Sequence, residues 1–578
     1  MVAAMGGIGQ VHCVRKVGGI RKVRSLKAGG ALAGAGRAAT LGALLASVSA
    51  VAMSETAFAR VEITPRAELR HTISDSEYGD FNMITAVAPG VSILADTRRV
   101  KAQVDYEFSR RFSWDDTLID KGQHRLNANG TAELIRRLLS VQAGAVVTQT
   151  FRDWRGPLSA GPEQNNPNQA TVGSYYVQPT LTRELGNFAV FDAFYRFSYS
   201  DVDNAGRSLQ IGEEAPPGFN FSLMPASDST MHDAMASLSN RNSSSSRLIW
   251  TARGTYRADD REDLDEELRM YTGVFDVSYS LNRKVALLGS VGYEDIFDEQ
   301  DNILVDPDTG LPVLDSEGRL QVDPTEPRRA VIDRKGEIWD VGVRLTPSRR
   351  TQLTLRGGRQ YGGTVINGDL QYEIREGITL TAKYSETLNS FGRLFTAELG
   401  GQPFAFMVDN NYRLGPGIIT IPTEFGLLPL PGTVTNATFR SRLGQASLSY
   451  SAGRTKATFA GYYDRRNYLN TGQVAGEDRP STGILSGRSD VTWGLTLGMS
   501  RDLGGGRSVN GNVYYSNLKY ALSRERRDSV YGGSVGYDWR LSDRIRASAT
   551  FYTLNRSVDG FGSSQQDNSL TLSVRASF

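Results

Sequence analysis

The sequence has very little of the residues on which most protein chemistry depends. Its 578 residues include one cysteine, Cys13, and four histidines. A single thiol cannot form an intramolecular disulfide or supply a multi-cysteine metal site. The 65 basic and 63 acidic residues leave a net charge of only +2, so the chain lacks the basic excess expected of a nucleic-acid-binding protein.

Long hydrophobic runs are also absent. Hydrophobic residues make up 39% of the chain and the mean hydropathy is −0.34, which excludes a bundle of transmembrane helices. A membrane β-barrel stays compatible with these values, because the inward-facing half of its wall is polar. The 61 glycines, 24 tyrosines and 23 phenylalanines also fit a barrel.

The N-terminal segment predicts export. Basic residues spread over 15–27 precede a short apolar stretch over 38–52, and Ala57-Phe58-Ala59 offers a cleavage site of small residues before Arg60. We therefore expect a signal peptide over residues 1–59, with a long basic region. A transmembrane anchor is the alternative, but the apolar stretch is too short and too rich in Gly and Ala to span a bilayer.

The last nine residues show the pattern that organises the rest. Apolar side chains alternate with polar ones from Leu570 to Phe578, which places the two kinds on opposite faces of an extended strand. A soluble strand could also alternate, but the pattern returns over 191–199, 248–256, 491–499 and 531–541. Strands with one apolar and one polar face are typical of a sheet between lipid and water.

The breaks between these segments are of two kinds. Short breaks with Gly, Asn, Asp or Pro lie at 95–97, 185–187, 281–283, 346–348, 375–377, 452–454, 504–506 and 541–543. Long polar breaks lie at about 155–170, 202–229, 298–331, 394–436 and 470–483. The two kinds alternate, as periplasmic turns and outer loops do in an outer-membrane barrel.

These features predict an all-β protein, a transmembrane antiparallel up-and-down β-barrel of about 22 strands (roughly 20 to 24) over residues 60–578. Because the first strand starts at Val61, we expect no N-terminal plug domain. A soluble β-sandwich is the alternative, and so many amphipathic strands fit it less well. The segments with the weakest pattern are 230–241 and 364–375.

Four stretches carry a resemblance to known barrels: 60–65, 110–116, 347–351 and 356–364. In these the chain resembles the β-barrel porin 2 proteins and the barrel proteins associated with exopolysaccharide and PEP-CTERM systems. The resemblance implies an outer-membrane barrel, with a link to exopolysaccharide export, and it transfers no functional residue. The C-terminal strand also resembles the signal read by the barrel-assembly machinery, in which we assign Leu570, Leu572, Val574 and Phe578.

No constellation of residues predicts catalysis. His71, His124 and His232 are scattered over the outer ends of strands or nearby loops, and the sequence has no Gly-x-Ser-x-Gly or His-Glu-x-x-His motif. The acid-rich segment 298–331 could hold Ca²⁺, but its spacing does not fit an EF-hand. We expect no enzyme activity, no cofactor and no metal site.

The segment 394–436 is unusually apolar for a loop. Phe404, Phe406, Ile419 and Phe425 belong to a set of apolar residues that would gain free energy by burial. Two arrangements are open: the segment folds into the lumen as a constriction, or it packs on the rim or against a partner.

The alternation also predicts which charged side chains face the lumen. They are Lys101, Asp105, Asp192, Arg196, Arg253, Asp276, Asp340, Arg344, Arg356, Asp369, Lys383, Asp538, Arg540, Arg546 and Arg575. A barrel of this size has a lumen that side chains alone cannot fill, so these charges either line a hydrated pore or brace the wall. Both signs occur, and the slight basic excess predicts a mild preference for anions.

The sequence thus favours a porin-like passive channel for polar solutes, including oligosaccharides or polysaccharide. The alternative is a non-conducting surface component that binds polysaccharide through its outer loops. A TonB-dependent receptor would need a plug domain, and an enzyme has the least support. Expected partners are outer-membrane lipid and lipopolysaccharide, the barrel-assembly machinery, and polysaccharide or small polar solutes, but not nucleic acid.

Overall fold

A computed structural model describes most of the chain from Arg60 to Phe578. The residues outside it are 1–59, 77–78, 115–121, 152–157, 162–167, 204–227, 241–245, 263–264, most of 303–320, most of 391–437, 469–488, 520–526 and 560–563. The predicted signal peptide lies outside the described residues. In the described part of the chain, no helix is long and apolar enough to cross a membrane.

The described chain is almost entirely β-strand. The strands are β1 (Arg60–Ser76), β2 (Gly79–Asp96), β3 (Val100–Ser113), β4 (Gly122–Ile135), β5 (Leu139–Phe151), β6 (Gln169–Leu185), β7 (Ala189–Asp203), β8 (Ser229–Ser239), β9 (Leu248–Arg261), β10 (Glu266–Ser280), β11 (Val285–Gln300), β12 (Arg329–Ser348), β13 (Thr351–Gln360), β14 (Gly363–Arg375), β15 (Ile378–Asn389), β16 (Thr420–Thr423), β17 (Gly426–Pro429), β18 (Phe439–Ala452), β19 (Thr455–Tyr468), β20 (Ser489–Gly504), β21 (Arg507–Lys519), β22 (Arg527–Arg540), β23 (Ile545–Asp559) and β24 (Gln565–Ser577).

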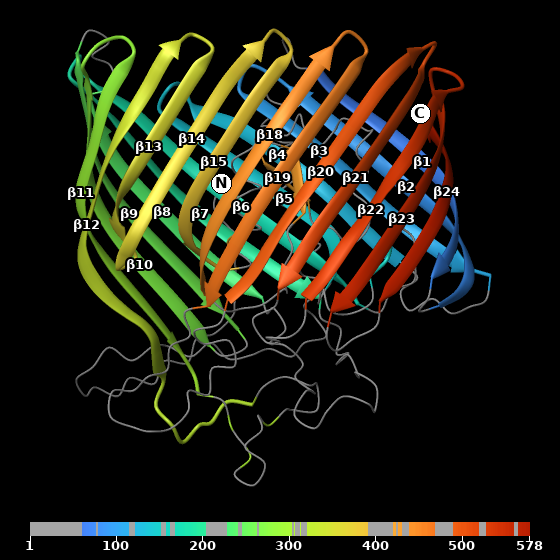
Figure 1. The fold of residues 1–578 in the computed structure, drawn as a ribbon, viewed down its shortest axis with the longest axis horizontal. Helices are drawn as coiled ribbons and strands as arrows, with labels where there is room; N and C mark the ends of the chain where they lie inside the picture. Colours follow the sequence, from blue (N-terminus) through green and yellow to red (C-terminus); the bar gives the residue numbers. More distant parts are fainter. Residues whose placement is uncertain are drawn as a thin grey trace, which may run out of the picture. The chain divides into compact units, whose positions relative to one another are not determined.

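These strands form one closed antiparallel barrel of 22 strands (Figure 1), in agreement with the predicted fold class. Each strand pairs with its neighbour in sequence, except that β15 pairs with β18 and the short β16 and β17 pair only with each other. The ring closes between β1 and β24, from Arg66 opposite Ser577 to Ser76 opposite Asp567. The described residues from Arg60 onward contain no plug domain.

The predicted alternation sets the two faces of the wall. On β24, Leu570, Leu572 and Val574 keep 37%, 45% and 48% of their surface exposed, whereas Thr571 and Ser573 keep 2% and 5%. The outward face of the other strands carries exposed apolar residues in the same way. An apolar outer band with every backbone group paired inside a closed sheet is the structure that hydrocarbon requires of a β protein.

The predicted short turns lie together at one end of the barrel (Figure 1), but the separation is incomplete, because the short connections β1–β2, β9–β10 and β13–β14 lie at the other end with the long ones. We call the end with the predicted short turns the turn end, and the other the loop end. The turn at Arg136–Leu138 belongs to the turn end and was not predicted, because it has no Gly, Pro, Asn or Asp. Gly377 shows why the other turns need such residues: its φ is +78°, and a Cβ there would lie 2.3 Å from the Ser451 carbonyl oxygen.

The two segments of weakest pattern are both strands, β8 and β14. β13 and β14 form a short hairpin, so β12 pairs with β13 only from Trp339 to Ser348. The loop-end part of β12 pairs with β11 alone. The rim of the loop end is therefore uneven next to this hairpin.

The two faces predict opposite responses to the same substitution. Leu497 lies on the outward face near the middle of β20 and is 45% exposed, and its neighbour Thr496 faces the lumen. Leu497→Arg should cost about 2–4 kcal/mol of folding free energy in a bilayer, and Thr496→Arg about 0.5 kcal/mol or less. Urea titrations of the protein in vesicles measure both. Equal losses would mean that Leu497 does not face hydrocarbon.

Candidate functional site

The lumen wall gathers the charged residues that the sequence predicts to face inward, and most of them are bonded to neighbouring side chains. The bonded ones are Asp105, Asp192, Arg196, Arg253, Asp276, Asp340, Arg356, Asp538 and Arg575. The predicted residues whose side chains form neither a hydrogen bond nor an ion pair with any described residue are Lys101, Arg344, Asp369, Lys383, Arg540 and Arg546. Most of the predicted charges thus brace the wall, and a smaller group stays available to interact with solutes in the lumen.

Arginines of β1 reach across β2 to carboxylates of β3. Arg66 Nη1 lies 3.0 Å from Asp105 Oδ1, and Arg70 Nη2 lies 2.5 Å from Glu107 Oε1. A Cβ at Gly90 of β2 would lie 2.9 Å from Arg66 Nε. Small inward-facing residues on β2 therefore let the guanidinium groups lie flat against the wall.

The same network also closes the barrel. Glu68 on β1 is 2% exposed and accepts a hydrogen bond from Arg70 at 3.1 Å. It also accepts one from Arg575 of β24 at 2.7 Å, across the β1–β24 seam. One buried carboxylate thus joins the first and last strands to the β1–β3 network.

A second network links four of the predicted residues across β9, β10, β12 and β13. Asp276 lies 3.4 Å from Arg253 and 3.4 Å from Arg356. Arg356 Nε lies 3.0 Å from Asp340, which also accepts a hydrogen bond from Ser290 of β11. Carboxylates and guanidinium groups alternate here, so neither charge dominates this sector.

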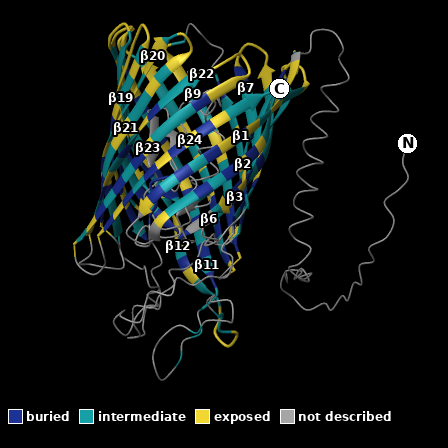
Figure 2. Cartoon of the chain, turned by 90° about the vertical axis from the view of Figure 1, so that its right-hand side faces the viewer, coloured by how far each residue is buried: buried dark blue, intermediate teal, exposed yellow. Residues whose placement is uncertain are grey.

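Exposure of the lumen face falls steadily from the turn end to the loop end. Along β1, Glu62 is exposed and Arg66 partly exposed, whereas Arg70 and Ser74 are buried. In Figure 2 exposed residues gather at the turn end, and buried residues appear farther along the strands. The inward-facing side chains are thus accessible near the turn end and mostly covered near the loop end.

One cause is a segment of the β5–β6 connection that lies inside the barrel. The backbone N–H of Leu158 donates to Gln565 Oε1 at 3.0 Å, and that of Ala160 to Asp567 Oδ2 at 3.3 Å. Leu158 is 2% exposed and packs against inward-facing apolar side chains of β21–β23, namely Leu518, Val530, Tyr552 and Leu554. We call residues 158–161 the inner segment.

A second cause is the base of the long connection between β15 and β18. Arg393 donates to Asp233 of β8 at 2.6 Å, and Ser390 donates to Asp259 of β9 at 2.5 Å. Thr438, at the other end of this connection, donates to Asp298 of β11 at 2.8 Å. Both ends of the connection are thus held against the inner wall of β8–β11.

A buried ion cluster lies at this contact. Arg261 is 2% exposed and lies 2.9 Å from Glu266, with Asp259 and Asp298 at 3.8 and 3.9 Å. Its Nη2 donates to the Thr438 hydroxyl at 2.8 Å. One guanidinium among three carboxylates is stable only with such additional hydrogen bonds, so Thr438 ties the connection to the wall.

One prediction about the lumen needs correction, and one feature of it was not predicted. The wall is not uniformly polar, because the inward-facing Leu518 and Val530, like Leu268 and Ile296 in a second cluster, are buried apolar residues near the loop end. The inner segment and the Arg393 and Thr438 contacts were not predicted. Apolar residues at inward positions of β10 and β11 were a sequence signal that the wall there is covered, but no sequence feature indicated which segments cover it.

The remaining predicted residues fall into two groups. Leu570, Leu572, Val574 and Phe578, assigned to the assembly signal, lie exposed on the outward face or at the turn end. Phe404, Phe406, Ile419 and Phe425, assigned to a loop constriction, lie outside the described residues, so their position stays a prediction.

The three histidines lie on the outward face, in the half of the barrel nearer the loop end. His124 Nδ1 lies 2.9 Å from the Tyr106 hydroxyl, His232 Nδ1 lies 2.7 Å from that of Tyr195, and His71 Nδ1 lies 3.1 Å from Thr85. These pairs belong with the aromatic residues expected at a membrane surface.

The acid-rich connection from β11 to β12 does not form a metal site in its described part. Asp323 accepts hydrogen bonds from the N–H and the hydroxyl of Thr325, which lower the pKa of that carboxyl. No group of three or more His, Cys, Asp or Glu residues in the described chain is placed to hold a metal ion.

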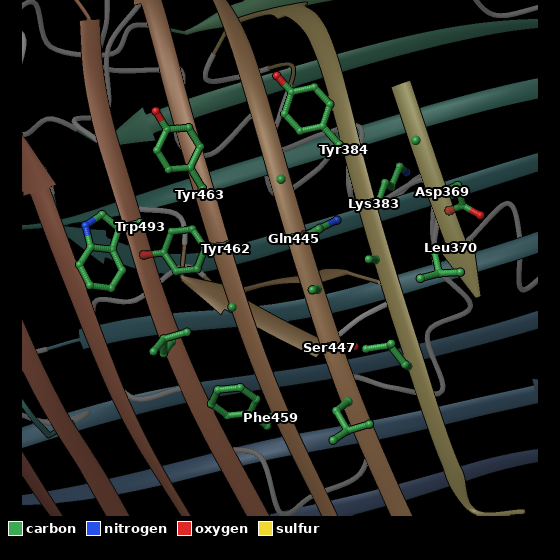
Figure 3. A pocket seen from close by; sticks show the side chains of 18 of the residues that line it. Asp369, Leu370, Lys383, Tyr384, Gln445, Ser447, Phe459, Tyr462, Tyr463 and Trp493 are labelled. Atoms are coloured by element: carbon green, nitrogen blue, oxygen red, sulfur yellow. The ribbon is translucent and has the colours of Figure 1, made fainter. Parts of the chain in front are cut away.

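A groove lies on the outward face of the wall. Side chains of Leu355, Leu448, Phe459, Tyr463 and Trp493 line it over β13–β20 (Figure 3). An apolar groove with Tyr and Trp at one end is a surface for lipid chains, and it is separate from the lumen.

Comparisons with known proteins add a fold likeness. No family model and no curated protein matches the chain. Among solved structures, it is similar to the ferric-catecholate import receptor Fiu from E. coli K12, with 9% identity, a TM-score of 0.46, and coverage of 89% of this chain and 82% of the receptor. The siderophore receptor PiuA from Acinetobacter baumannii is 8% identical, with a TM-score of 0.44 and coverage of 89% of this chain and 82% of the receptor. The copper transporter OprC is 11% identical, with a TM-score of 0.43 and coverage of 90% of this chain and 81% of the transporter. The likeness is confined to the outer-membrane barrel architecture.

The seam carboxylate generates a stability prediction. Glu68→Ala leaves Arg575 and Arg70 with fewer acceptors inside a buried site, and should lower the free energy of unfolding by about 3–5 kcal/mol. Glu337→Ala, at an exposed position of β12, should change it by about 0.5 kcal/mol or less. Urea unfolding in vesicles, followed by tryptophan fluorescence, compares the two. A loss at Glu68 no larger than at Glu337 would contradict a bracing role.

Proposed function

We propose that the protein is an outer-membrane channel through which polar solutes diffuse, and that segments at its loop end restrict the passage. The observation that carries the proposal is the exposure gradient of the polar lumen face, from open at the turn end to buried at the loop end. A barrel of 22 strands encloses more space than its wall side chains fill, so passage depends on what else lies inside.

The two inward contacts identify what would restrict passage. The inner segment is held by two backbone hydrogen bonds and the burial of Leu158. The β15–β18 connection is held by Arg393 and Thr438. Both sets of contacts are local, so the segments can be released without breaking the ladder of the barrel.

In this proposal the barrel is passive and carries out no catalysis. It is exported by its N-terminal segment, inserted by the barrel-assembly machinery and surrounded by outer-membrane lipid and lipopolysaccharide. The solutes are small polar molecules or polysaccharide. A silent barrel that binds polysaccharide through its loop end is the competing function, and conductance separates the two.

Releasing the inner segment should increase passage. Leu158→Asp places a charge in the apolar cluster of β21–β23 and should detach the segment, because an unpaired buried carboxylate costs several kcal/mol. Single-channel recording in planar bilayers should then show a higher conductance than that of the unsubstituted protein.

Leu158→Met is the matched control, since it keeps the volume and the apolar contact and should leave conductance unchanged. If the unsubstituted protein and the Leu158→Asp variant are both silent in bilayers while folded, the channel function is wrong. If both conduct equally, the inner segment restricts nothing.

A further inference from the structure

Three arginines lie side by side on the lumen face near the turn end. In the strand register, Arg540 of β22 lies directly opposite Arg546 of β23, and Arg546 lies directly opposite Arg575 of β24. Arg575 is neutralised by Glu68 at 2.7 Å. Arg540 and Arg546 are both exposed, and neither forms an ion pair with any described residue.

Asp538, an acidic residue on the same face of β22, is hydrogen-bonded to the neighbouring strand. Asp538 precedes Arg540 by two residues and accepts a hydrogen bond from Asn510 of β21 at 2.7 Å. Arg540 packs against Gly506 in the turn before β21, where a Cβ would lie 2.9 Å from Arg540 Cβ and 3.3 Å from Arg540 Nε. Both arginine side chains are exposed at the turn-end mouth.

Like charges directly opposite each other in an antiparallel pair are destabilising. An anion between them would turn the repulsion into two charge-assisted hydrogen bonds, and a planar guanidinium matches the geometry of a carboxylate or phosphate. Most other arginines of the wall differ from this pair because they are paired with carboxylates, as Arg253 and Arg356 are with Asp276.

The rim around this pair is also basic. Each connection described at the turn end carries an exposed Arg or Lys within it or directly beside it, except β6–β7, where Arg183 lies three residues before the turn. These residues are Arg98, Arg99, Arg136, Arg137, Arg247, Arg283, Lys284, Arg349, Arg350, Arg375, Arg454, Arg507 and Arg544.

Acidic residues at the same rim include some that cap the turns. Glu133 accepts a hydrogen bond from the Arg137 N–H at 2.6 Å, and Asp502 from the Gly504 N–H at 2.7 Å. Others, such as Glu184 and Asp543, are exposed. The basic residues outnumber them, so the field at this mouth favours anions.

We propose that Arg540 and Arg546 form a binding site for organic anions that carry carboxylate or phosphate groups, and that the barrel therefore prefers anionic solutes. This site adds a solute preference to the channel proposed above. The preference for anions in transport therefore rests on the channel proposal. Binding itself depends only on the residues at the mouth.

The transport test measures ion selectivity. In planar bilayers with a KCl gradient, the reversal potential should indicate preference for Cl⁻. The double variant Arg540→Gln/Arg546→Gln should shift the reversal potential toward the equilibrium potential of K⁺. The matched control Arg501→Gln/Arg507→Gln removes the same charge from the outward face of β20 and β21 at the same end, and should retain most of the preference.

The binding test does not need a conducting channel. Detergent-solubilised protein is titrated with the trisulfonated dye pyranine, and fluorescence anisotropy follows binding. The Arg540→Gln/Arg546→Gln variant should bind pyranine about tenfold more weakly, since it loses charge-assisted hydrogen bonds to the dye. The Arg501→Gln/Arg507→Gln control should bind pyranine as tightly as the unsubstituted protein does.

The two readouts separate the possible failures. Dye binding that needs Arg540 and Arg546 in a silent barrel would overturn the channel and leave the anion site in place. Equal dye binding and equal selectivity in the double variant and its control would overturn the anion site, whether or not the barrel conducts.

Discussion

The structure depends on closing one hydrogen-bonded ring. A strand edge left open in hydrocarbon would expose unpaired N–H and C=O groups, each at a cost of several kcal/mol, so the first and last strands have to pair. β1 and β24 pair from Arg66 opposite Ser577 to Ser76 opposite Asp567. Glu68 strengthens the seam from inside by binding Arg70 on its own strand and Arg575 on the last strand. The outward apolar band and the inward polar wall both follow from this closure, since alternate residues must face hydrocarbon and lumen.

A large polar lumen creates a second constraint, because charged groups placed inside it need partners. The chain meets this in two ways. Long arginines lie flat across small residues of the adjacent strand to reach carboxylates, as Arg66 does past Gly90. Near the loop end, the inner segment and the base of the β15–β18 connection cover the wall. What remains accessible is the turn-end half, and there the unpaired charges are mostly basic. The same wall thus provides mechanical bracing at one depth and a charged surface at another.

Much of the fold was predictable from local pattern, and much of the site was not. Alternation with period two, as in Leu570 to Phe578, determines which side chains face outward, and turn residues such as Gly377 mark the hairpins. Both signals are local and were sufficient for strand number and facing. The turn at Arg136–Leu138 was missed because arginines can occupy a turn without a characteristic residue. Contacts between distant segments had no local signal: nothing near Leu158 or Thr438 indicates that they meet β22–β24 or β11. Even for Arg540 and Arg546, the alternation predicted that they face the lumen, but only the register places them opposite each other.

The accessibility of introduced thiols tests most directly whether exposure of the lumen face falls from the turn end to the loop end. The only native cysteine, Cys13, falls in the predicted signal peptide, so single cysteines can be introduced without background in the barrel. Lys101→Cys and Arg344→Cys place thiols on the exposed lumen face near the turn end, and Ser74→Cys and Ser569→Cys place them on the buried lumen face nearer the loop end. With a small, charged maleimide present on both sides of the bilayer, the first pair should be modified rapidly and the second pair far more slowly. Equal rates at all four positions would contradict a lumen that is open at one end and closed over much of the other.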